Sequence, residues 1–264
     1  MDGLAAYLLL GAAVGFFGGL FGIGGGTLLV PVLLFLFTAR HFPAAYAMHL
    51  ALGTSMATIV FTALSSLYQH HRHGAVQWRV VGTLTPGILA GTAAGTTLAA
   101  VISAQALGVI FAAFVLTASL RVMLDAKPRP SRQLPGPFGL TAAGMFIGGL
   151  GALVSIGGGA IMVPFFVWCN LPLRKAIGTS AAVGFPLAAG GTLGYIIGGM
   201  QATSLPGPHL GYVYLPALLG TASASVLAAP LGARLTHRIN VALLRRLFAF
   251  LLLGLAVKLV LKVF

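Results

Sequence analysis

Long apolar stretches alternate with short polar or proline-rich joints along this chain, and the pattern predicts helical segments. No stretch shows the ten-residue apolar/polar alternation of a membrane β-barrel, so the segments are expected to be helices. We place ten of them at 4–21, 24–38, 46–68, 78–102, 105–124, 137–154, 158–170, 176–200, 210–232 and 240–261.

Four of these segments are short for a bilayer, which needs roughly 20 residues of helix. They form two pairs, the first with the second and the sixth with the seventh. Each pair is either two short crossings or a re-entrant hairpin with a tip near the midplane. In both alternatives the chain enters and leaves a pair on the same side of the membrane.

The amino-acid composition indicates that these helices lie in a membrane. The chain of 264 residues is 58% hydrophobic and 6% charged, with a mean hydropathy of +1.02, whereas soluble domains carry about 25% charged residues. Such a chain cannot cover a surface facing water, so an integral protein of the lipid bilayer is predicted. The first apolar stretch has no basic residue before it, only Asp2, so it is interpreted as retained structure and not as a signal peptide.

A repeat divides the chain. The motif "GIGGGTLLVP" (22–31) matches "SIGGGAIMVP" (155–164), and "ALGTSMA" (51–57) matches "AIGTSAA" (176–182) in the same order. The halves are therefore predicted at 1–124 and 138–264, joined by a Pro-rich and charged linker at 125–137. Five segments per half is an odd number, so the second half is expected to have inverted topology.

The basic residues agree with this arrangement under the positive-inside rule. With the linker inside, three basic residues fall outside, Arg40, Lys258 and Lys262, and both termini are external. The other twelve fall inside: Arg72, Arg79, Arg121, Lys127, Arg129, Arg132, Arg174, Lys175, Arg234, Arg238, Arg245 and Arg246. The net charge of +13 is thus explained by orientation, and no nucleic-acid partner is predicted.

The two glycine runs are the strongest candidate binding features. Irregular backbone at membrane depth is tolerated only inside protein or along a wet cavity. Each run precedes a helix whose first N–H groups are unpaired and carry partial positive charge, which favours an anion without a cationic side chain. The predicted donors are Gly24, Gly25 and Gly26 in the first half and Gly157, Gly158 and Gly159 in the second. The alternative is close helix packing, which suits Gly148 and Gly149 better.

Hydroxyl groups recur in the paired GTS motifs. Thr54, Ser55, Thr179 and Ser180 are predicted to donate to the same anion; alternatively they bond back to their own helices. His49 precedes the first motif and is a further candidate for anion binding or proton transfer, or a polar residue at a helix start. The tract "HHRH" at 70–73 is interpreted as a solvated basic joint.

Missing chemistry excludes several function classes. Asp2 and Asp125 are the two acidic residues, and neither lies in the middle of a segment, so carboxylate-based coupling or aspartyl proteolysis is not expected. One cysteine, Cys169, gives no disulfide, redox pair or metal motif. We expect no enzyme activity, no cofactor and no metal. A transporter of a small oxyanion is predicted, with a non-transporting scaffold or assembly subunit, or a permease for a different ion, as alternatives, and with a possible homo-oligomer.

The two glycine motifs and the two GTS motifs resemble the sulfite exporter TauE/SafE family of bacterial and archaeal membrane proteins. The resemblance covers essentially the whole chain, although Ser155 stands where the first motif has Gly22. It implies export of sulfite, organosulfonates or related small sulfur-containing anions across the prokaryotic plasma membrane.

Overall fold

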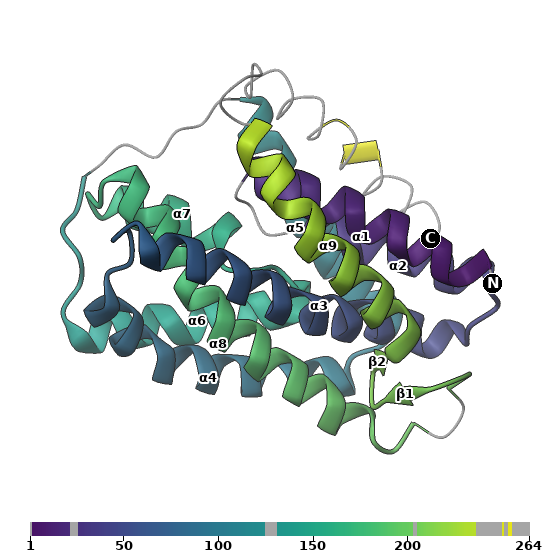
Figure 1. Ribbon diagram of the computed structural model, residues 1–264. Helices are drawn as coiled ribbons and strands as arrows, with labels where there is room; N and C mark the ends of the chain where they lie inside the picture. The colour runs from purple at the N-terminus through teal and green to yellow at the C-terminus, as the bar shows by residue number, and fades with distance from the viewer. Residues whose placement is uncertain are drawn as a thin grey trace.

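The computed structural model describes residues 2–21, 26–124, 131–202, 205–235, 250 and 253–254. Within these residues the chain is helical apart from joints and one short hairpin (Figure 1). The helices are α1 (Asp2–Phe21), α2 (Gly26–Ala39), α3 (Ala44–Arg72), α4 (Trp78–Val101), α5 (Ala104–Met123), α6 (Pro137–Val154), α7 (Gly159–Trp168), α8 (Leu173–Gly199) and α9 (Leu215–Leu235). The first glycine run up to Gly25 and residues 125–130 of the linker lie outside the described residues. The predicted tenth segment does too, apart from positions 250, 253 and 254.

The described helices follow nine predicted segments closely, and five of them are long and apolar enough to cross a membrane. One boundary was wrong. The ninth segment was expected to begin at 210, but β1 (His209–Leu210) and β2 (Val213–Tyr214) form an antiparallel hairpin before α9. Gly211, between the two strands, has a positive φ of 55° and permits the tight turn, and Gly207, just before β1, has a φ of 72°.

Helices from the two halves of the sequence pack closely against each other. In Figure 1, α3 and α8 lie in the middle of the molecule, with α1 beside α9 and α4 beside α6. Small residues make these contacts possible. A Cβ on Gly15 would overlap the main chain of Ser225, and one on Gly148 would overlap that of Ile88, so the close-packing role expected for Gly148 is confirmed.

The connections between the helices lie at two opposite ends of the molecule. At the left of Figure 1 lie the α3–α4 joint and the chain leading into α6. The α7–α8 joint is there too, because the Arg174 side chain donates to the His73 carbonyl (3.0 Å) and the Ser131 and Arg132 amides donate to the Trp168 carbonyl. We call this the basic end, defined by residues 73–77, 131–136 and 169–175.

The opposite end, which we call the hairpin end, carries β1, β2 and the N-terminus of α1 (Figure 1). Aromatic rings close it, since Tyr214 contacts Tyr7, Phe37 and Phe42 at centroid distances of 5.2–6.2 Å. Arg40 lies over the Tyr7 ring at 5.2 Å. The described basic residues of the predicted inside joints therefore gather near one end, and Arg40 lies at the other.

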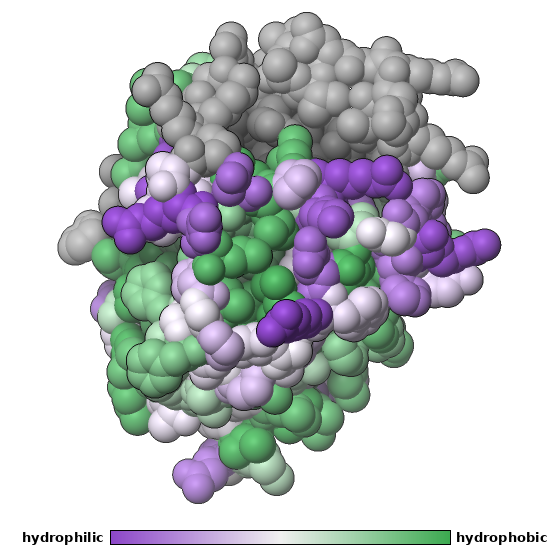
Figure 2. Space-filling view, turned by 90° about the vertical axis from the view of Figure 1, so that its left-hand side faces the viewer, coloured by the Kyte–Doolittle hydropathy of each residue, from purple (hydrophilic) through white to green (hydrophobic). Residues whose placement is uncertain are grey.

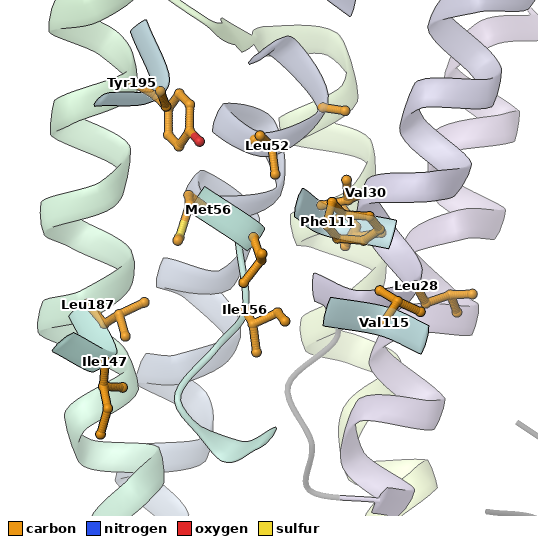
Figure 3. Packing of buried hydrophobic residues seen from close by; sticks show 14 of the residues in the cluster. Leu28, Val30, Leu52, Met56, Phe111, Val115, Ile147, Ile156, Leu187 and Tyr195 are labelled. Carbon is orange, nitrogen blue, oxygen red and sulfur yellow. The ribbon is translucent and has the colours of Figure 1, made fainter. Parts of the chain in front are cut away.

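The second glycine run is a buried break between α6 and α7. Ser155 ends α6 in the left-handed conformation (φ 47°), and residues 155–158 are all buried. Figure 3 shows Ile156 of the break among core side chains, between Leu28 and Val115 on one side and Leu187 and Ile147 on the other in this view. The irregular backbone thus faces protein, as expected for a break at membrane depth.

Candidate functional site

The second glycine run is held against α8 by close backbone contact. A Cβ placed on Gly158 would lie 3.1 Å from the Ser180 carbonyl oxygen and 3.5 Å from the Gly184 Cα atom. No side chain among the described residues caps the start of α7 at Gly158. The first four N–H groups of a helix have no partner within it, so this helix start presents partial positive charge beside α8.

The two serines of the GTS motifs are buried without a hydrogen-bond partner. Ser55 and Ser180 are 0% and 1% exposed, and neither Oγ atom has a partner among the described residues. Neighbouring hydroxyls do bond back to their helix, as Thr58 does to the Thr54 carbonyl at 2.9 Å. An unsatisfied buried polar group costs about 1–3 kcal/mol, so these two hydroxyls are candidates for a ligand that the chain itself does not supply.

The two threonines of the GTS motifs have structural partners. Thr54 Oγ1 accepts the Tyr214 amide at 3.0 Å, and Thr179 Oγ1 accepts the Gln77 amide at 3.0 Å. Each amide belongs to the residue just before a helix of the other half, α9 or α4. The sequence predicts both threonines as ligand donors, and this stays a prediction, because a hydroxyl oxygen that accepts an amide can still donate its own proton. In the structure each oxygen accepts an amide that precedes a helix start.

The glycines of the two GTS motifs repeat the same arrangement. Gly53 packs on the carbonyl of Tyr212, and Gly178 packs on the carbonyl of Ala75. In both cases the carbonyl lies two residues before the amide that the threonine accepts. Two equivalent contacts therefore join each half of the sequence to the other.

A cavity of about 790 Å³ opens at the basic end and reaches the second glycine run. Figure 2 looks onto this end, where hydrophilic side chains surround an apolar hollow. Its inner part is lined by Gly157, Gly158, Gly159 and Ser180. Its wall and mouth are lined by Val14, Gly15, Gly18, Ile59, Thr62, Ala63, Ser65, Ser66, Gln69, His70, His73, Ala75, Arg174, Ile177, Ala181, Gly184, Ala229 and Pro230.

The charges around this cavity favour an anion. Arg174 is a lining residue with a fixed positive charge, and His70 and His73 are lining residues as well. No Asp or Glu is among the described lining residues. Positions 71–73 are exposed, in line with the interpretation of 70–73 as a solvated joint, but the sequence did not predict that His70 and His73 line a cavity. The signal was available, because Thr62, Ser66, Gln69 and His73 continue the face of α3 that holds Ser55 at helical spacing.

The other predicted site residues lie elsewhere. His49 is 4% exposed at the hairpin end, where its Nε2 is 3.0 Å from the Ala99 carbonyl and its ring lies 4.9 Å from the Tyr212 ring. It is not brought to the cavity.

Gly26 is buried against the Ser155 carbonyl, so the start of α2 meets the break of the second half. Gly24 and Gly25 lie outside the described residues.

An apolar exterior, a buried helix break at 155–158 and an internal cavity define this chain as a helical membrane protein. Residues 7–259 match the model of the family described as sulfite exporter TauE/SafE, and the chain belongs to that family.

Relatives of this chain are named as transporters. It is 35% identical to a "probable membrane transporter protein" of Haemophilus influenzae over 97% of both chains. It is 28% identical to the "probable membrane transporter protein YunE" of Bacillus subtilis, covering 80% of this chain and 82% of the relative. A probable membrane transporter protein of Methanocaldococcus jannaschii is 26% identical over 90% and 88%. No solved structure matches. The family and these names support a membrane transporter.

Proposed function

We propose that this protein is a secondary transporter that exports small sulfur-containing oxyanions, such as sulfite or organosulfonates. The observation that carries the proposal is the Ser180 hydroxyl, which is buried and unpartnered beside Gly157, Gly158 and Gly159 on a cavity lined by no described carboxylate. Backbone N–H groups at a helix start and a free hydroxyl are donors that an oxyanion can accept from.

This donor set suits binding followed by release. Hydrogen bonds to an ion are strong individually, but no described residue places a fixed positive side chain in the inner part of the cavity, where it would hold the anion tightly. Arg174 lies at the mouth, where its Nη2 already donates to the His73 carbonyl. In the proposal Arg174 attracts the anion into the cavity, while Ser180 and the glycine amides bind it.

Two inverted halves are part of the proposal. The reciprocal packing of α1 on α9 and of α4 on α6 supports it, as do the matched contacts of the two GTS motifs. The gathering of the described joint residues Arg72, Arg79, Arg132 and Arg174 near the basic end supports a cytoplasmic basic end under the positive-inside rule. Both termini are then external, and the membrane is the plasma membrane of a prokaryote.

Export needs no coupling carboxylate under this scheme. An inside-negative potential favours exit of an anion by about 2.3 kcal/mol per charge per 100 mV. Transport of an ionised anion should therefore respond to membrane potential without needing a proton gradient.

The test uses purified protein in proteoliposomes loaded with radiolabelled sulfite, sulfoacetate, sulfate or phosphate. Efflux is measured after a potassium diffusion potential is imposed, and again after a pH gradient alone is imposed. We expect efflux of at least one sulfur oxyanion that follows the potential. Movement of none of these anions by protein that is folded and correctly inserted would overturn the proposal and favour a scaffold role.

A further inference from the structure

The two unpartnered serines occupy equivalent places in the two GTS motifs, but only one of them borders the cavity. Ser180 is a lining residue, whereas Ser55 is not. Ser55 lies four residues before Ile59 on the same helix, so it sits one turn deeper on the face of α3 that lines the cavity. Both hydroxyls are fully buried and lack partners among the described residues.

Ile59 marks the point where the cavity ends on this face. It lines the cavity and is 2% exposed. Its Cδ1 atom lies 3.0 Å from the position that a Cβ of Gly26 would take, so its side chain reaches across to the start of α2. The same Cβ position would overlap the Ser155 carbonyl, so Ile59 lies where the start of α2 meets the helix break of the second half.

The equivalent position in the second GTS motif is Gly184, four residues after Ser180. A Cβ on Gly184 would meet only the Gly158 amide nitrogen at 3.6 Å and the Ala63 Cβ at 3.9 Å. That space is open to the cavity, and Gly184 is itself a lining residue. The same helical position therefore carries a bulky side chain beside one serine and none beside the other.

We propose that Ile59 is a gating residue that separates Ser180 from a second anion half-site at Ser55. This inference rests on the proposed function, because it assigns both serine hydroxyls to one anion path. The Ile59 side chain closes the path in the state seen here, with the cavity open at the basic end. The anion passes from Ser180 to Ser55 when the α2 start and the Ile59 side chain move apart.

The chemistry fits an apolar gate. A β-branched side chain is stiff about χ1, and an isoleucine against glycine and backbone offers an anion no hydrogen bond. A buried ion without partners is costly, so a short apolar layer is enough to stop leakage. Gly184 places no side chain between Ser180 and the cavity, although Ser180 itself is buried in this state.

Thiol accessibility tests the gate directly. Cysteines are introduced as Ser55→Cys or Ser180→Cys in a Cys169→Ala protein, in membrane vesicles of both orientations, with a small anionic methanethiosulfonate reagent. The basic-end side is identified as the side from which Arg174→Cys reacts.

From that side Ser180→Cys should react at least tenfold faster than Ser55→Cys. Adding Ile59→Ala should speed the Ser55→Cys reaction at least tenfold, and Ile59→Val, which loses only the atom that reaches Gly26, should speed it less.

The matched control is Ile177→Ala, which removes the same atoms from another lining residue on α8. It should leave the reaction of Ser55→Cys unchanged, and thermal unfolding of every variant shows that the fold is retained. If Ser55→Cys reacts equally fast with and without the Ile59→Ala change, or if Ile177→Ala has the same effect as Ile59→Ala, the gate is refuted. The proposed function fails separately, if sulfur oxyanions do not slow the reaction of Ala181→Cys inside the cavity.

Discussion

Replacing Ser180 by Ala tests the proposed anion site with little disturbance of packing. The change removes one oxygen from a side chain that is 1% exposed and has no partner among the described residues. A hydrogen bond to a charged group contributes about 1.5–3 kcal/mol. At RT of about 0.59 kcal/mol, its loss should weaken anion affinity roughly 10- to 150-fold.

Stability should respond in the opposite direction. An unsatisfied buried hydroxyl costs about 1–3 kcal/mol, so without anion Ser180→Ala should unfold at the same temperature as the wild type or at a higher one. Affinity is read from the half-saturating anion concentration for transport in proteoliposomes. Unfolding is followed in detergent, with and without the anion.

Ser119 offers a matched control. It lies on α5, is 1% exposed, has an unpartnered Oγ among the described residues, and is not a cavity-lining residue. Ser119→Ala should share the stability effect and leave transport unchanged. If Ser180→Ala binds and transports the anion as Ser119→Ala does, the assignment of Ser180 to the anion site is refuted.

Three further predictions follow from the contacts around the site. Thr179→Val should lower the unfolding temperature, because it leaves the Gln77 amide without its acceptor, whereas Thr179→Ser should match the wild type; equal stability of both variants would contradict this. Arg174→Gln should weaken apparent affinity and reduce its dependence on salt, measured as the half-saturating concentration at low and high ionic strength; an unchanged salt dependence would contradict an attracting role. Arg132→Cys should react with an impermeant thiol reagent from the cytoplasm and Pro206→Cys from outside, and reaction of both from one side would contradict the inverted halves.

Much of the fold could be predicted because a bilayer imposes simple rules on a sequence. Apolar length sets helix existence, so the predicted segments correspond to α1–α9 within a few residues. The hairpin of β1 and β2 was missed, because its apolar residues continue into α9 and only Gly207 and Gly211 mark the turn. The buried break at 155–158 could be predicted, because glycines that pack helices together are spaced four residues apart, whereas the glycines of this run are adjacent.

For the candidate site, the sequence predicted the types of residue that line the cavity, but it could not separate the roles that we propose for them. The sequence could not show that the threonines of the two GTS motifs have hydrogen-bond partners while the serines have none. The partners are the Gln77 and Tyr214 amides, which only the tertiary packing brings close. His49 was linked to the anion path by its position in the sequence, yet it lies against Tyr212 at the hairpin end. Arg174 was predicted only as one of the basic residues of the inside joints, and its place at the cavity mouth depends on its contact with the His73 carbonyl in the joint between α3 and α4.

Locating a bound anion tests the central claim most directly. Selenite is a close analogue of sulfite, and its selenium gives an anomalous signal in crystals of the protein. We predict one strong peak in the cavity, with oxygen atoms in hydrogen-bond range of the Ser180 hydroxyl and the Gly157–Gly159 amides, and its loss in Ser180→Ala crystals. A peak at the mouth alone, or one that persists unchanged in Ser180→Ala, would contradict the account.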